Sequence, residues 1–172
     1  NSYVQSRWYR APEVMLGLPW GPKVDVWGIG TILAELVLGY PIFPGQTVEA
    51  VLGAHAAVLG YPPEHMLRHA QTVSMYYMPS GRLFSVDPPG APPGQTFFVN
   101  PLETSLRALL KLEDDGLADL LASLLTIDPA ARPTAAEALR HPWLAQFAEA
   151  AAAAPCADGP SARRRLIPSP TP

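Results

Sequence analysis

The chain has 172 residues, which is enough for one domain that buries a core without disulfide or metal crosslinks. Hydrophobic residues make up 48% of it and charged residues only 16%, a composition that excludes a wholly disordered protein. Because 12 basic side chains face 15 acidic ones, the net charge is -3, and no overall basic field favours nucleic acid or an anionic membrane as a partner.

Residues 1–12 show neither a helical nor an alternating period, so we expect them to form a loop. A helix is predicted from Val24 to Leu38, where the sequence is apolar on almost all faces, and this helix should be buried on most sides. The stretch is too short and too acidic for a membrane span, so we expect no membrane partner. Gly28 and Gly30 within it indicate close helix packing rather than a dinucleotide-binding loop.

The middle of the chain is predicted to combine helices with an irregular insert. Thr47 is a suitable N-cap for a helix that ends at Gly60, and the proline pair that follows fits the first turn of a short helix through Leu67. The region from about 68 to 112 is rich in proline, glycine and aromatic residues and has no long period. We interpret it as an insert.

Leucines recur with a helical period over residues 117–125 and predict a helix with one apolar face. Thr134 and Glu137 have the spacing of a capping box, which predicts a last helix that runs to about Arg140. Residues 148–172 are first rich in alanine and then in proline, and we expect them to form a disordered tail.

The only cysteine, Cys156, can form no disulfide within the chain, and no secretory leader opens the sequence. We therefore expect an intracellular protein, in the cytoplasm, the nucleus or both. Arg163–Arg165 could direct nuclear import or bind phosphate, but a solvated terminal run of charge is the commoner meaning of such a sequence.

General-purpose motifs leave the function open. His65 and His69 would share a helix face, but Met66 stands where a zinc-binding helix carries glutamate, so we expect two ordinary surface histidines and no metal site. The sequence contains no nucleophile elbow, and no lysine follows a glycine-rich phosphate loop.

A more specific signal comes from three segments in a fixed order: Tyr3-Val-Gln-Ser-Arg-Trp-Tyr-Arg-Ala-Pro-Glu13, Asp25-Val-Trp-Gly-Ile-Gly30 and Asp128-Pro-Ala-Ala-Arg-Pro133. Together they resemble a protein kinase. The triplet that ends at Glu13 matches the end of the activation segment, and the second segment is similar to the start of the central helix of the C-terminal lobe. Arg132 matches a late arginine of the family.

The first segment also narrows the resemblance within the kinases. Ser6-Arg-Trp-Tyr-Arg-Ala-Pro-Glu13 is similar to the CMGC group. Tyr3-x-Gln-Ser-Arg7, together with Gly17-Leu-Pro19, resembles the branch of dual-specificity tyrosine-regulated kinases and their homeodomain-interacting relatives.

The resemblance implies a mainly α fold, in which residues 1–147 form a C-terminal lobe portion of the protein kinase-like fold and 68–112 is a CMGC-type insert. The intact parent would be α+β with two lobes. In this family Glu13 and Arg132 would meet as a buried ion pair, and Trp27 would have a structural role in the central helix.

Asp25 is the lone charge near the start of the predicted apolar helix. It must either emerge at the helix N-terminus, where a carboxylate is favourable, or accept strong hydrogen bonds. The resemblance implies the second role, in which this aspartate holds the backbone of the catalytic loop.

The resemblance also implies roles for the opening loop. Tyr3 matches the tyrosine that the dual-specificity branch phosphorylates in its own activation loop, and Arg7 and Arg10 could clamp that phosphate. Ser6, Arg7, Trp8 and Tyr9 match the segment that binds the substrate, and a preference for proline after the phosphoacceptor is expected from CMGC relatives.

Phosphoryl transfer by a kinase needs ATP and magnesium together with several catalytic sequence motifs. None of these motifs occurs in the 172 residues. We therefore predict no catalytic residue here and an inactive chain on its own, with ATP and magnesium bound only by the intact parent. The N-lobe and catalytic loop would act in cis, and the substrate would be a protein. The alternative is a non-catalytic module, either a pseudokinase or a truncated product that binds partners.

Overall fold

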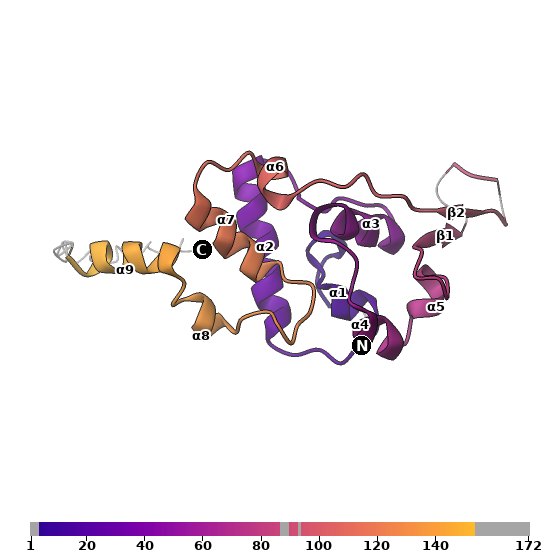
Figure 1. Cartoon of the computed structure of the whole chain (residues 1–172), viewed down its shortest axis with the longest axis horizontal. Helices are drawn as coiled ribbons and strands as arrows, with labels where there is room; N and C mark the ends of the chain where they lie inside the picture. The colour runs from indigo at the N-terminus through magenta and orange to yellow at the C-terminus, as the bar shows by residue number, and fades with distance from the viewer. Residues whose placement is uncertain (1–3, 87–89, 93, 154–172) are drawn as a thin grey trace, which may run out of the picture.

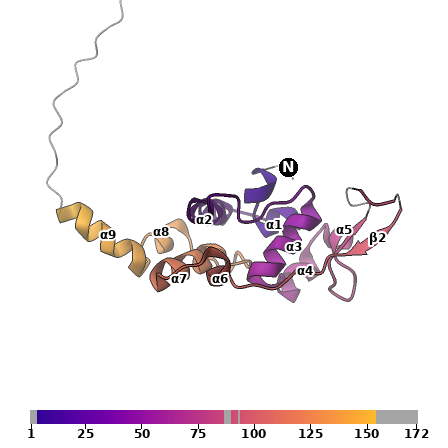
Figure 2. The same cartoon turned by 90° about the horizontal axis from the view of Figure 1, so that it is seen from above.

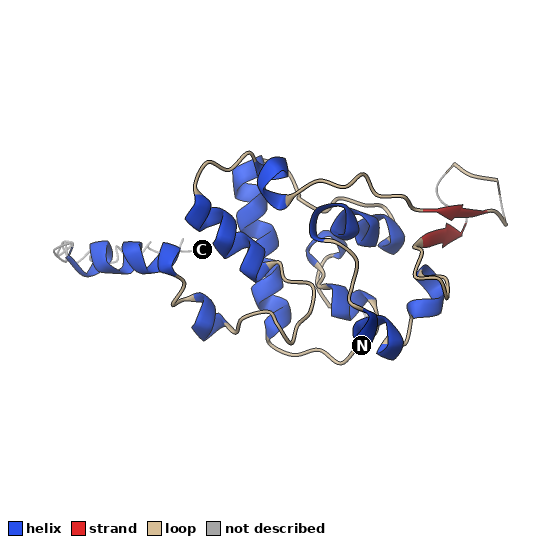
Figure 3. Cartoon of the chain, viewed as in Figure 1, coloured by secondary structure: helices blue, strands red, loops and turns tan. Residues whose placement is uncertain are grey.

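The computed structural model describes residues 4–86, 90–92 and 94–153, with side chains described only up to residue 147. Within this part the fold is mostly helical, with one small sheet (Figures 1 and 3). In chain order the elements are η1 (Arg7–Tyr9), α1 (Pro12–Met15), α2 (Lys23–Leu38), α3 (Val48–Leu59), α4 (Glu64–His69), α5 (Val73–Tyr76), β1 (Phe84–Val86), β2 (Thr96–Phe98), α6 (Leu106–Leu110), α7 (Asp115–Leu124), α8 (Ala135–Ala138) and α9 (Pro142–Ala153).

Helix α2 confirms the predicted helix over 24–38, but the prediction that it is buried on most sides is wrong. It packs on α7, α6 and η1, and Figure 2 shows α6 and α7 along one side of it. The described elements leave another part of its surface open, so four large apolar side chains of α2 remain 40–75% exposed: Ile29, Ile32, Leu36 and Val37. Gly39 ends the helix with a φ of +80°, a conformation that glycine adopts without strain.

Gly30 lies where α2 crosses α7. A Cβ atom at this position would be 3.0 Å from the Cβ of Leu124 and 3.0 Å from a methyl of Leu125. The prediction of close helix packing is therefore confirmed for Gly30. Gly28, on a different face, has only one neighbour near its missing Cβ, the side chain of Gln5 at 3.5 Å.

The ends of α3 follow the sequence signals. The Thr47 hydroxyl accepts a hydrogen bond from the amide of Ala50, and Gly60 follows the last helical residue with a φ of +89°. The inner face of the helix buries Val51 and Leu52 against the core.

The predicted insert is not irregular throughout. It contains α5, a two-stranded antiparallel sheet and α6. In the sheet Phe84 pairs with Phe98 and Val86 with Thr96. The strands have three residues each, too short for an alternating pattern to show in the sequence.

The leucine-rich helix is confirmed as α7, which buries Leu120, Leu121 and Leu124. The capping box of Thr134 and Glu137 is also confirmed, but helix α8 ends at Ala138 rather than near Arg140.

A further helix, α9, runs to Ala153, so the predicted boundary of the disordered tail at residue 148 falls inside a helix. The physical reason is that consecutive alanines have the highest helix propensity. Arg163–Arg165, Cys156 and the rest of the predicted tail lie outside the described residues. Within the described part of the chain, no helix has the length and apolar character needed to cross a membrane.

Candidate functional site

The segment predicted to bind substrate forms the short helix η1 and is anchored to the loop before α3. The indole nitrogen of Trp8 donates a hydrogen bond of 2.8 Å to the carbonyl of Gly45, and the Arg7 guanidinium donates to the carbonyl of Gln46. Together with Ser6 these residues line an open depression of about 440 Å³. Three of the four predicted substrate-binding residues therefore meet in one exposed surface.

Tyr9, the fourth predicted residue, faces α2 instead. Its hydroxyl donates a hydrogen bond of 2.6 Å to Oε2 of Glu35, and this bond raises the pKa of Tyr9. Tyr9, Glu35, Ile32 and Leu36 line a separate shallow depression on the exposed side of α2. Tyr9 thus joins the substrate segment to the central helix.

Gln5 holds the segment from below, a role that the sequence analysis missed. It has a φ of +65°, which is rare for a residue other than glycine. Its side-chain amide donates to the carbonyl of Val24 at 2.9 Å, and its side-chain oxygen accepts from the amide of Ala11 at 3.0 Å. A single glutamine therefore links the start of the loop, the start of α1 and the start of α2. The only available signal was its place in the quoted motif.

Only the two arginines of the phosphate clamp predicted for Tyr3 can be described, because Tyr3 lies outside the described residues. Arg10 donates two hydrogen bonds to the backbone that directly follows Tyr3, at 3.0 Å to the carbonyl of Val4 and at 2.9 Å to that of Gln5. Arg7 is exposed and bonded to Gln46. The clamp itself stays a prediction.

Glu13 and Arg132 form a bidentate ion pair across 119 residues of sequence. The two guanidinium nitrogens Nη1 and Nη2 contact Oε1 and Oε2 at 2.7 and 2.9 Å, and both side chains are at most 1% exposed. The remaining donors of Arg132 bond to three backbone carbonyls, those of Lys23, Thr126 and Ile127. Since every donor direction is used, the buried charge is fully compensated.

An aromatic cluster packs beside this ion pair. The Arg132 guanidinium lies 5.1 Å from the ring centroid of Trp27, which is fully buried and stacks on Phe43 at 5.9 Å. His55 completes the cluster. Burial, with a smaller effect of the Arg132 charge, lowers the pKa of His55 to about 3. No pattern in the sequence indicated that His55 is buried.

Asp25 is exposed in the first turn of α2, and its carboxylate makes no hydrogen bond or ion pair within the described part of the chain. It has the first of the two environments considered for it, at a helix N-terminus where a carboxylate is favourable. Its bond to a catalytic-loop backbone stays a prediction.

His65 and His69 both bond, but not to a shared ligand. Nε2 of His65 lies 3.0 Å from Oδ2 of Asp128, and Nδ1 of His69 lies 2.7 Å from the carbonyl of His65. Among the described residues, no three or more histidine, cysteine, aspartate or glutamate side chains gather as a metal site would require.

The match to known proteins covers the segments described above. Residues 1–144 match the family model of the protein kinase domain. Dual specificity tyrosine-phosphorylation-regulated kinase 2 of Drosophila melanogaster is 37% identical over 147 residues, which cover 83% of this chain and 19% of the relative.

Two further relatives agree. Dual specificity tyrosine-phosphorylation-regulated kinase 4 of Homo sapiens is 35% identical over 149 residues, or 84% of this chain and 27% of the relative. Serine/threonine-protein kinase ppk5 of Schizosaccharomyces pombe is 35% identical over 143 residues, or 83% of this chain and 16% of the relative. The chain thus spans well under a third of the length of these relatives.

Proposed function

This chain belongs to the protein kinase family, in the dual-specificity tyrosine-regulated branch of the CMGC group, and from that premise we propose that it is a C-terminal lobe portion of a kinase. The proposed kinase transfers the γ-phosphate of ATP to serine or threonine of protein substrates, and to its own Tyr3. The observation that carries the proposal is the buried bidentate pair of Glu13 and Arg132, which fixes the substrate segment to the late helices.

The described residues do not fit ATP and magnesium. The sequence contains none of the motifs that hold ATP and magnesium in a kinase, and among the described residues no three or more histidine, cysteine, aspartate or glutamate side chains gather in a cluster. No catalytic step is therefore assigned to any residue of this chain. Its proposed contribution is to bind and orient the substrate protein.

The proposed substrate surface is the depression formed by Ser6, Arg7, Trp8 and the Gly45-Gln46 backbone. The Trp8 indole is 42% exposed while its nitrogen is already bonded to Gly45, so its face offers apolar area without an unmet donor. A proline ring after the phosphoacceptor would stack on such a face. This supports the proposed preference for proline.

The exposed side of α2 supports the proposal that the chain is one portion of a larger lobe. Ile29, Ile32, Leu36 and Val37 are at least 40% exposed on one helix. Contiguous apolar area of this kind is usually covered by another part of the protein. We propose that the covering part is the segment that carries the catalytic loop.

The test of function uses the longest natural protein that contains this chain. With labelled ATP and magnesium, it should phosphorylate a peptide in which proline follows the serine. A peptide with alanine in place of that proline should react more slowly. Trp8→Ala should reduce this discrimination. Trp20→Ala is the matched control, because Trp20 is 48% exposed and lies outside the depression. Absence of nucleotide binding and transfer would favour the non-catalytic module instead.

The test of the lobe proposal compares two exposed leucines, Leu36 at 75% and Leu102 at 91% exposure. In the 172-residue chain, glutamate at either position should change the free energy of unfolding by no more than about 0.5 kcal/mol. In the longer protein only Leu36→Glu should destabilise, because only Leu36 would become buried. Equal effects of the two variants in the longer protein would contradict the proposal.

A further inference from the structure

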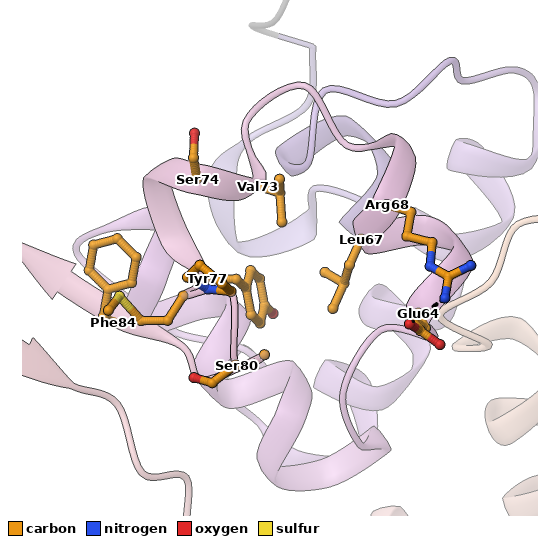
Figure 4. Close-up of a pocket in the computed structure, with 11 residues that line it drawn as sticks. Glu64, Leu67, Arg68, Val73, Ser74, Tyr77, Ser80 and Phe84 are labelled. Carbon is orange, nitrogen blue, oxygen red and sulfur yellow. Dashed lines mark hydrogen bonds and ion pairs between the residues drawn. The ribbon is translucent and has the colours of Figure 1, made fainter.

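A cavity of about 590 Å³ lies between α4, α5 and the start of β1, separate from the proposed substrate surface (Figure 4). No residue of the segment Ser6–Tyr9 lines it. Most of its wall is apolar, formed by Leu67, Val73, Tyr77, Met78, Pro79 and Phe84. Both its volume and its lining are in the range of sites for small molecules.

Tyr77 supplies a polar group that the fold leaves unused. The residue is 4% exposed, and its hydroxyl has no hydrogen-bond partner among the described residues. Figure 4 shows the ring directed into the cavity, facing Leu67. Burial raises the pKa of Tyr77, so the hydroxyl stays protonated and can donate a hydrogen bond. A buried donor without an acceptor is costly, and an acceptor atom that enters beside it would remove that cost.

The charged groups at the rim argue against a charged ligand. Arg68 and Glu64 line one side of the cavity and pair with each other at 2.6 Å, and both side chains are at least 70% exposed. Their charges cancel, and no other charged side chain of the described residues lines the cavity. A phosphate or carboxylate would find no unpaired cation there, so a neutral ligand fits best.

The walls are held by the backbone and do not depend on a ligand. The amide of Met78 donates to the carbonyl of Arg82 at 2.9 Å, and Tyr77 pairs with Leu83 in an isolated bridge. On the other side, the Thr72 hydroxyl and amide bond to the carbonyls of Met15 and Leu16, which fixes the start of α5 on α1. The cavity is therefore formed in advance, as ligand sites commonly are.

We propose that this cavity binds a small, neutral and mainly apolar molecule with one hydrogen-bond acceptor, which receives a hydrogen bond from the Tyr77 hydroxyl. The inference goes beyond the proposed kinase function. It depends only on the cavity, and it can hold whether or not the parent protein transfers phosphate.

The experiment compares two probes of nearly the same shape, acetophenone and α-methylstyrene, in which a carbonyl oxygen is replaced by a methylene group. Binding to the full chain is followed through the ¹³C-methyl NMR signal of Met78, which lines the cavity. Acetophenone should shift this signal saturably and bind more tightly than α-methylstyrene. Tyr77→Phe should weaken acetophenone about three- to tenfold and leave α-methylstyrene unchanged.

Tyr40→Phe is the matched control. It removes the same hydroxyl from a tyrosine that is 55% exposed and does not line the cavity, so it should change neither affinity. Tyr77→Phe removes only an unpartnered group and should fold normally, which a melting curve checks. Leu67→Trp should fill the cavity and abolish the Met78 shift for both probes. The proposal is overturned if acetophenone gives no saturable shift, or if Tyr77→Phe binds it as tightly as the unchanged chain.

Discussion

The ring of Trp27 and the ring of His55 meet edge to face, with centroids 4.9 Å apart and planes at 66°. Phe43 contacts the same imidazole at 4.5 Å. Neither ring nitrogen of His55 has a hydrogen-bond partner among the described residues. A protonated imidazole would therefore be both desolvated and close to the positive charge of Arg132.

Acid should consequently destabilise the fold through His55. Its pKa is about 3 in the folded chain and about 6.5 when unfolded, so the unfolded state takes up the proton first as pH falls. Titration of His55 should leave the free energy of unfolding unchanged above pH 6.5. Well below that pH, it should lower this free energy by roughly 1.4 kcal/mol for each unit by which the pH falls. Urea titrations between pH 7.5 and 5 measure this slope.

The control for that slope is a pair of histidine variants. His55→Leu keeps an apolar side chain in the cluster and should flatten the profile, whereas His69→Gln, at an exposed position, should leave it unchanged. An identical slope in His55→Leu and the unchanged chain would contradict the role of His55.

Loss of the Glu13 charge should destabilise strongly. Glu13→Gln leaves the Arg132 guanidinium buried without a counterion, which costs about 3–5 kcal/mol of unfolding free energy. Glu64→Gln breaks an exposed pair with Arg68 and should cost less than about 1 kcal/mol. Chemical denaturation of both variants gives the comparison, and similar losses would show that the Glu13 pair contributes no more than a surface pair.

The two glycines of α2 should respond in opposite directions to alanine. Gly30→Ala forces a methyl to within 3.0 Å of Leu124 and Leu125, so we expect a loss of about 1–3 kcal/mol. Gly28→Ala meets only ordinary contact with Gln5 and should gain up to about 1 kcal/mol from helix propensity. Melting temperatures of the two variants check this, and a stabilised Gly30→Ala would mean that α2 and α7 can separate without cost.

Phosphate on Tyr3 should be protected by Arg7. The Arg7 guanidinium is exposed, and it can exchange its bond to the Gln46 carbonyl for stronger, charge-assisted bonds to phosphate. In the longest natural protein, phosphatase should remove this phosphate more slowly than one from a flexible loop. Arg7→Ala should erase the difference and Arg140→Ala should not. Equal removal rates in all three proteins would exclude the clamp.

Local signals in the sequence were enough for most helices. Thr47 and Gly60 mark the ends of α3, and the capping box of Thr134 and Glu137 marks the start of α8, because each of these residues bonds to backbone only a few positions away. The Glu13 and Arg132 pair has no local signal and was predicted only through the resemblance to kinases.

Features that depend on distant partners could not be read in this way. The apolar sequence of α2 predicts burial on most sides, because residue type alone does not show whether another element covers a side chain. His55 looks like a surface residue of a helix, and only the tertiary positions of Trp27 and Phe43 enclose it. Gln5 acts through bonds to Ala11 and Val24 that no pattern announces.

The long separation of Glu13 and Arg132 also bears on how the protein is made. A ribosome adds about 5–20 residues per second, so the 119 positions between them take about 6–24 seconds to synthesise. During that time the Glu13 carboxylate has no partner, because Arg132 has not yet been synthesised. Docking of the loop through this pair therefore has to wait until Arg132 has been synthesised.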